Sequence, residues 1–123
     1  MSYPVVESVT ITTNTSGAAT SYTGVVRGEV STIKYVKDDY ANGVDFTITT
    51  EDTEQNLWVD TNINASETVC PRQPTHDATG AASLYAAAGE PVEAPIYACG
   101  ERIKIVIAQG GDTKAGTFKV VIV

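Results

Sequence analysis

Basic residues and long apolar runs are scarce in this sequence, and each shortage excludes a class of protein. Eight lysines and arginines stand against fifteen acidic residues, which gives a formal net charge of −7 at pH 7. Because nucleic acids and anionic membranes attract clustered positive charge, we expect neither as a partner. No stretch reaches the ~18–20 apolar residues of a membrane helix. The acidity is then best explained as a source of solubility.

The sequence also lacks the marks of secretion. Its first residues, Met1-Ser2-Tyr3-Pro4, have no positive charge before an apolar run, so we expect no signal peptide and synthesis in a cytosol. The two cysteines, Cys70 and Cys99, are too few for a disulfide framework. They are a candidate pair for one disulfide, and two buried free thiols are the alternative.

Leucine is nearly absent, with only Leu57 and Leu84, whereas threonine, valine and alanine are abundant. This composition favours pleated strands over helices. Several short segments alternate apolar and polar residues, and turn signals separate them every 8–12 residues or so. We therefore predict one all-β domain over residues 1–123, an antiparallel β-sandwich or a jelly-roll-like barrel.

Local turn chemistry predicts how some strands pair. An Asn-Thr-Ser-Gly turn predicts a hairpin between residues 8–13 and 18–23. A glycine-rich turn predicts a second hairpin between residues 103–108 and 117–123, with the first of these strands in a central position. A change in the phase of apolar residues near Thr32 predicts either a β-bulge or a strand that becomes buried on both faces.

Residues 61–95 differ from the rest in composition, because they contain four of the five prolines and many alanines and threonines. We predict a long, ordered Pro/Ala-rich loop that crosses the surface. Such a loop would serve as a contact arm, or it would close the bottom of the domain's own core. Both interpretations stay open at the level of sequence.

The residues that suggest chemistry are few and poorly spaced. Four of them have side chains that bind zinc: Cys70, His76, Asp77 and Cys99. They include no Cys-x-x-Cys pair, so their spacing is unlike that of zinc sites. His76 and Asp77 also lack a nucleophile elbow around Ser66 or Ser83. We predict that the chain is not an enzyme and binds no metal or cofactor.

Several stretches carry a resemblance to a known group of proteins. They are IKYVKDDYANGVDFTIT at residues 33–49, ERIKIVIAQGG at 101–111, Gly116-Thr117-Phe118, Pro71-Arg72, Thr75-His76-Asp77 and Leu84-Tyr85-Ala86-Ala87. Together they resemble small uncharacterised structural proteins of tailed bacteriophages and prophages, encoded among the head and head–tail genes. The resemblance covers most of the chain from Gly24 onward.

The resemblance implies a virion structural protein, made in the host bacterial cytoplasm. Within that class it implies a capsid decoration or cement protein, a homo-oligomer that binds the major capsid protein. A head completion or neck component is the first alternative, and a carbohydrate-binding β-sandwich on the virion surface is the second. The candidate interface residues, most of them from the predicted arm, are Arg72, His76, Leu84, Tyr85 and Tyr97.

Overall fold

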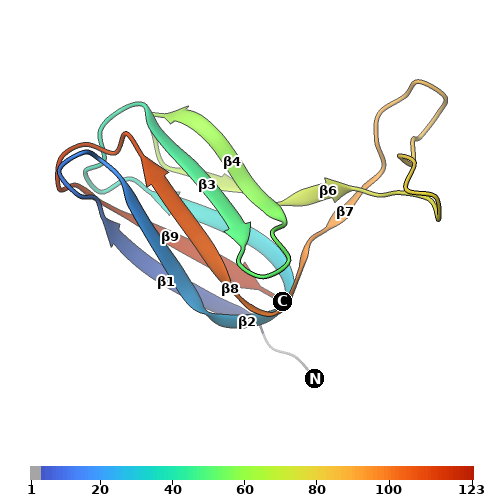
Figure 1. Ribbon diagram of the computed structural model, residues 1–123, viewed down its shortest axis with the longest axis horizontal. Coiled ribbons are helices and arrows are strands. Elements are labelled where there is room, and N and C mark those ends of the chain that lie inside the picture. Colours follow the sequence, from blue (N-terminus) through green and yellow to red (C-terminus); the bar gives the residue numbers. More distant parts are fainter. Residues whose placement is uncertain (1–3) are drawn as a thin grey trace.

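The computed structural model describes residues 4–123, and all regular structure in that range is β-strand (Figure 1). In chain order the strands are β1 (Val5–Thr12), β2 (Ala19–Val36), β3 (Val44–Thr50), β4 (Asn56–Ile63), β5 (Glu67–Val69), β6 (Arg72–Pro74), β7 (Glu93–Pro95), β8 (Tyr97–Ala108) and β9 (Ala115–Ile122). Every pairing between them is antiparallel. The prediction of an all-β antiparallel sandwich is confirmed.

The two layers of the sandwich share one long strand, β2. Neighbouring strands follow the order β1-β9-β2-β8-β3-β4, and β5 pairs with β2 outside this path. Up to Glu29, β2 pairs with β8; from Val30 onward it pairs with β9. The register shifts between Val30 and Thr32, so the bulge predicted near Thr32 is confirmed. This bulge is where β2 leaves one layer and enters the other.

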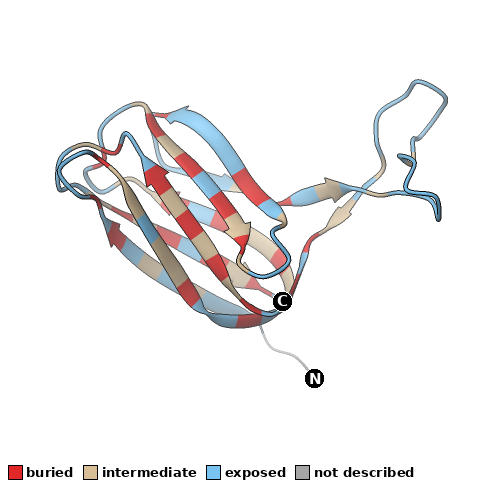
Figure 2. Cartoon of the chain, viewed as in Figure 1, coloured by how far each residue is buried: buried red, intermediate tan, exposed pale blue. Residues whose placement is uncertain are grey.

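The core lies between the layers and is rich in isoleucine and aromatic side chains. Along β8 and β9 buried and more exposed residues alternate, as the strand period requires (Figure 2). An aromatic cluster fills the centre: Tyr35, Tyr40, Phe46, Trp58 and Phe118. Their ring centroids lie 4.7–6.0 Å apart, within the range of favourable aromatic contact.

Both predicted hairpins are wrong. β1 pairs with β9 along its whole length rather than with β2, and β8 lies between β2 and β3 rather than beside β9. The position of β8 inside the sheet is confirmed. The error has a physical cause, because a turn reverses the chain without fixing which strand the returning segment joins. Here both turns carry the chain across to the other layer.

The two crossing turns lie against each other at one end of the sandwich. The amide of Gly110 donates to the carbonyl of Gly17 at 2.9 Å. Gly17 has a φ of 83°, and a Cβ at that position would lie 2.9 Å from the amide nitrogen of Gly111. A side chain is therefore excluded at Gly17 on two grounds, conformation and space.

The prediction of one loop over residues 61–95 needs correction. Its first residues complete β4, and β5 then pairs with β2, so both belong to the sandwich. What remains projects away from the body instead of crossing its surface (Figure 1). These strands were not predicted because Thr and Asn are common in this segment, and because β5 has only three residues, too few to show an apolar alternation.

Candidate functional site

A projecting arm, residues 72–95, is the feature that distinguishes this chain from a plain sandwich (Figure 1). Strands β6 and β7 form its stem, with Arg72 opposite Pro95 at the base. The stem leaves the sandwich between two buried residues, Pro71 and Ile96. Burial of both flanking residues attaches the arm to the body at two points, one on each of its strands.

Hydrogen bonds at the base also set the direction of the arm. Gln55, in the turn between β3 and β4, donates through Nε2 to the carbonyl of Tyr97 at 3.0 Å. The Oε1 atom of Gln55 accepts from Nε2 of Gln73 in the stem at 3.3 Å. On the other side, the carbonyl of Ile96 accepts from the amide of Val30 at 2.8 Å.

A buried carboxylate holds the turn between β3 and β4, which carries Gln55. Glu101 is only 5% exposed, and its oxygens accept from the amides of Asp52 at 2.7 Å, Thr53 at 2.9 Å and Cys99 at 3.1 Å. Burial raises the pKa of Glu101, but the hydrogen bonds from Thr53, Cys99 and Asp52 outweigh it and leave the pKa below its usual value. Glu101 therefore stays ionised and fixes the turn beneath the arm.

Beyond the stem, the arm is organised by its own backbone. Thr75 donates from its amide to the carbonyl of Val92 at 2.8 Å, and its carbonyl accepts from the amide of Ser83 at 3.0 Å. The amide of Val92 donates to the carbonyl of Ser83 at 2.9 Å, so three chain segments meet at one junction. The junction gives the arm a defined shape without a hydrophobic core of its own.

Asp77 closes the first of two small turns beyond this junction. Its Oδ1 atom accepts from the hydroxyl of Thr79 at 2.7 Å, the amide of Thr79 at 2.8 Å and the amide of Ala81 at 3.1 Å. These hydrogen bonds, chiefly that from the Thr79 side chain, lower the pKa of Asp77. His76 pairs through its backbone with Ala82. The Oδ1 atom of Asp77 is thus occupied by donors of its own turn.

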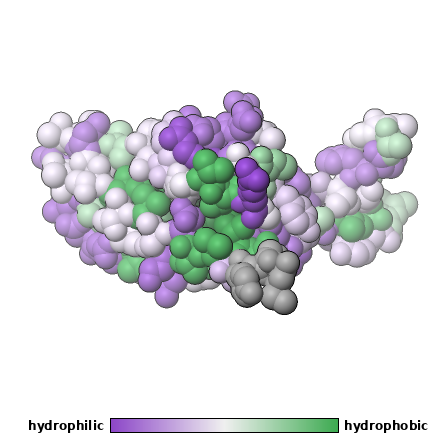
Figure 3. Space-filling view, turned by 90° about the horizontal axis from the view of Figure 1, so that it is seen from below, coloured by the Kyte–Doolittle hydropathy of each residue, from purple (hydrophilic) through white to green (hydrophobic). Residues whose placement is uncertain are grey.

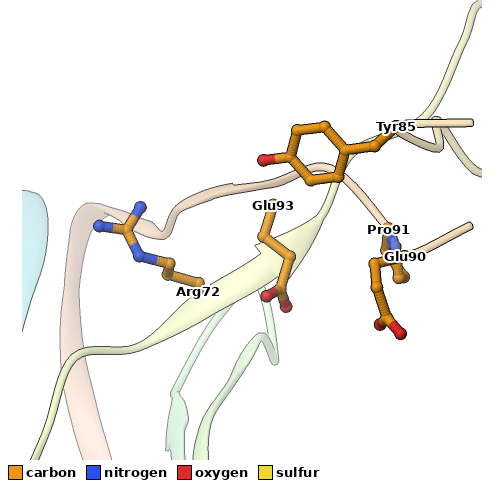
Figure 4. Close-up of a pocket in the computed structure, with 5 residues that line it drawn as sticks. All are labelled: Arg72, Tyr85, Glu90, Pro91 and Glu93. Atoms are coloured by element: carbon orange, nitrogen blue, oxygen red, sulfur yellow. The ribbon is translucent and has the colours of Figure 1, made fainter.

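The arm carries an open hollow of about 580 Å³ on one side. Its lining residues are Arg72, Tyr85, Glu90, Pro91 and Glu93 (Figure 4). Tyr85 is 75% exposed, and the neighbouring Leu84 is exposed as well. Throughout residues 4–123 the single ion pair joins Arg102 to Glu51, so the charges around Tyr85 are unpaired within the chain.

The structure brings some of the predicted interface residues together and separates others. Arg72 and Tyr85 line the same hollow, and Leu84 is adjacent in sequence. His76 lies in the other turn of the arm, and Tyr97 lies at the base, where it is 55% exposed at the start of β8. The prediction from sequence missed Glu90 and Glu93, although each lies next to or near a proline in the arm.

The two thiols are free and exposed, so the expectation that they are buried is wrong. Cys70 follows Val69, which pairs with Ile33, whereas Cys99 pairs with Arg27 on the same strand β2. At ~3.3 Å per residue, this offset separates the cysteines by on the order of 15 Å. A disulfide needs Cα atoms within about 7 Å, so the register does not support the predicted pairing.

A second hollow, of about 260 Å³, lies between β1 and the first half of β2. We call it the seam groove, and its lining residues are Val5, Glu7, Val25, Val26, Arg27 and Ile122. Apolar side chains gather on this underside of the molecule (Figure 3). The sequence prediction missed the groove, because it forms where β1 and β2 lie close without pairing, a consequence of topology.

Three further findings concern metal binding, membrane-spanning helices and the stacking of sugar rings. Among residues 4–123, no three or more His, Cys, Asp or Glu side chains are grouped so that they could hold a metal ion. The same residues contain no helix with the length and apolar character needed to span a membrane. Trp58 is buried in the core, so it offers no platform for a sugar ring.

Comparison with known proteins found no match. No family of known proteins matches its sequence, and no curated protein is similar to it.

Proposed function

We propose that this chain is a structural protein of a tailed-phage virion, a decoration protein that binds the major capsid shell as a homo-oligomer. The observation that carries the proposal is the arm. None of the buried core residues lies within residues 72–95, yet the arm holds a defined shape and exposes Leu84 and Tyr85. An element that adds nothing to its own core, and that presents large apolar side chains, is typical of a contact surface.

The composition of the arm supports the same role. Proline and short hydrogen-bonded turns restrict its backbone before any partner binds, so docking costs less conformational entropy than it would for a flexible chain. The sandwich supplies a rigid base, and Gln55 holds the stem in one direction relative to that base. In this proposal the protein performs no catalysis and acts through its surface alone.

The alternative of carbohydrate binding has less support. Sugar rings stack on exposed aromatic faces, and Tyr85 and Tyr97 are the large aromatic residues most exposed among residues 4–123. They lie in different elements, one in the arm and the other at the start of β8. The hollow around Tyr85 is bordered by one guanidinium and two carboxylates, a pattern better matched to a charged protein surface.

The test is to purify particles of the phage that encodes this chain and to count its copies per particle by quantitative mass spectrometry. A decoration protein should be present in hundreds of copies, and a label on the chain should cover the shell in negative-stain images. A dozen copies or fewer, with the label at one vertex, would replace the proposal with a neck component. Absence of the chain from washed particles would overturn a virion role altogether.

The arm itself is tested by a variant in which residues 75–92 are replaced by an Asn-Gly turn between β6 and β7. Supplied to particles that lack the chain, this variant should fail to bind, whereas the complete chain should bind. A matched Val59→Asp variant changes an exposed valine on β4, away from the arm, and should bind like the parent. Equal binding by all three would mean that the arm is not a contact element.

A further inference from the structure

The seam groove has the character of a docking site. Val25 is 63% exposed, and Val5, which is also exposed, lines the same groove. Val26 and Ile122 form a buried apolar floor. The one polar link across the seam among residues 4–123 is the amide of Gly24, which donates to Oε1 of Glu7 at 2.9 Å.

Two strand edges that are largely without partners border the groove. Within the described part of the chain, β1 pairs with β9 alone. The first half of β2 pairs with β8, and at its end the amide and carbonyl of Glu29 also bond the backbone of Val123. Their remaining edges border the groove, and on the other side of β2 the pairing with β8 is irregular around Val25 and Val26. An apolar floor between two free edges suits an extended or hairpin segment from another chain.

We propose that the groove binds the arm of a second copy of this chain, with Leu84 and Tyr85 seated over Val25. The arm is the largest element of the molecule that exposes apolar side chains outside the sandwich, and the groove is a concave apolar surface on the body. This contact deepens the proposed function, on which it rests for its biological use, by naming the surfaces through which copies join.

The charges around the two surfaces are complementary. Arg27 lies on the rim of the groove, and no hydrogen bond or ion pair within residues 4–123 satisfies its guanidinium. Around Tyr85 lie the carboxylates of Glu90 and Glu93. In the proposed contact these carboxylates pair with Arg27, and Arg72 of the arm pairs with Glu7.

The positions of arm and groove favour a closed pair of molecules. Val30 pairs with Ile122 in the groove floor, and its amide also bonds the carbonyl of Ile96 at the arm base. Arm base and groove thus lie at the same end of the sandwich. A two-fold axis at that end lets each copy place its arm in the groove of the other, which buries both contacts at once.

Sedimentation of the purified chain at a series of concentrations tests the contact. The chain should dimerise, and Tyr85→Ala in the arm or Val25→Asp in the groove should each raise the dimer Kd by at least about 30-fold, as loss of a hot-spot residue does. The control is Val59→Asp, another exposed valine changed to aspartate, at a site 56% exposed on β4. It should dimerise like the parent, and circular dichroism should show all variants folded.

Mixing the two defective variants gives the sharper result. The Tyr85→Ala variant keeps an intact groove and the Val25→Asp variant keeps an intact arm, so a mixed pair regains one of its two contacts. The mixture should associate more tightly than either variant alone. An Arg27→Glu change should weaken the dimer, and Glu90→Arg with Glu93→Arg in the same chain should restore it in part.

Three results would overturn the contact: a parent chain that stays monomeric at every concentration, a dimer insensitive to Val25→Asp, or no gain on mixing. None of them depends on phage particles. A chain that dimerises as described and is absent from particles would overturn the proposed function alone. A chain that coats particles and stays monomeric when purified would overturn the arm–groove contact alone.

Discussion

At the scale of single residues, two buried tyrosines in the same aromatic cluster differ in one hydrogen bond. The hydroxyl of Tyr40 donates to the carbonyl of Ile11 at 2.7 Å. The hydroxyl of Tyr35 is buried and has no partner. Burial, with smaller effects of Asp38 and Asp39, raises the pKa of Tyr35 to about 12. An unpartnered buried hydroxyl costs free energy that a phenylalanine would not.

We therefore expect Tyr35→Phe to increase the free energy of unfolding by up to about 1 kcal/mol. The matched variant Tyr40→Phe should lower it by about 1–3 kcal/mol, because the carbonyl of Ile11 loses its donor. Urea unfolding followed by tryptophan fluorescence measures both, since Trp58 packs on Phe46 in the same cluster. A loss of stability in Tyr35→Phe would mean that its hydroxyl has a partner in solution.

The carboxylate of Glu101 gives a second prediction at this scale. Glu101→Gln should lower the free energy of unfolding at pH 7 by about 2–3 kcal/mol, because an amide cannot accept from all the donors that now surround the carboxylate. Urea unfolding measures the loss. Glu54→Gln, at an exposed position in the same turn, is the control and should have little effect.

The pH dependence of this effect follows from the lowered pKa of Glu101. A carboxyl whose pKa is lower in the folded state stabilises the fold above its ordinary pKa of about 4.5, and that contribution disappears as the pH falls through the lowered value. The difference in the free energy of unfolding between the parent and Glu101→Gln should therefore be largest near neutral pH and should decrease below about pH 4. A difference that is constant between pH 7 and pH 3 would contradict this assignment.

At the scale of elements, the arm and the sandwich are energetically separate. Residues 75–92 contribute nothing to the buried core, and the amide of Thr75 already bonds the carbonyl of Val92 across their base. Replacing these residues by an Asn-Gly turn should leave the melting temperature of the sandwich within about 4–8 °C of the parent, the shift that 1 kcal/mol produces in a domain somewhat smaller than this one. Differential scanning calorimetry measures the melting temperature. Loss of the cooperative unfolding transition in this variant would show that the arm supports the core.

The elements also show what the sequence could and could not predict. Strand type and the bulge near Thr32 followed from local alternation, because each depends on which residues face the core. The partner of each strand did not follow. β1 joins β9 from the far end of the chain, and no turn signal near β1 encodes that choice.

The candidate site was predicted only in part, for a related reason. Composition alone marked the segment that contains the arm, and Arg72 and Tyr85 do share one hollow. The seam groove was not predicted, because its residues come from three strands, β1, β2 and β9. Val25 looks like an ordinary strand residue in sequence, and only the missing strand beside it leaves it exposed.

At the scale of the whole molecule, the pairing of the first strand with the last dominates folding. Val5 pairs with Ile122, so this contact closes a loop that contains almost the entire chain, at a large cost in conformational entropy. Such non-local topologies fold slowly, and we expect refolding in milliseconds to seconds in stopped-flow experiments. The variant without residues 75–92 should refold at a similar rate, because the contacts of the arm are mostly local. Refolding in microseconds would contradict the topology.

The antiparallel pairing of the terminal strands has a mechanical consequence. The start of β1 and the end of β9 lie at the same end of their shared ladder, with Val5 opposite Ile122. A pulling force applied at the start of β1 and the end of β9 would break the hydrogen-bonded pairs of this ladder one after another, instead of loading all of them at once. These two strand ends therefore resist a pulling force poorly. The arm, in contrast, joins the body through two separate buried residues, Pro71 and Ile96. Cargo that must withstand tension belongs on the arm side, and cargo meant for gentle release belongs at the ends.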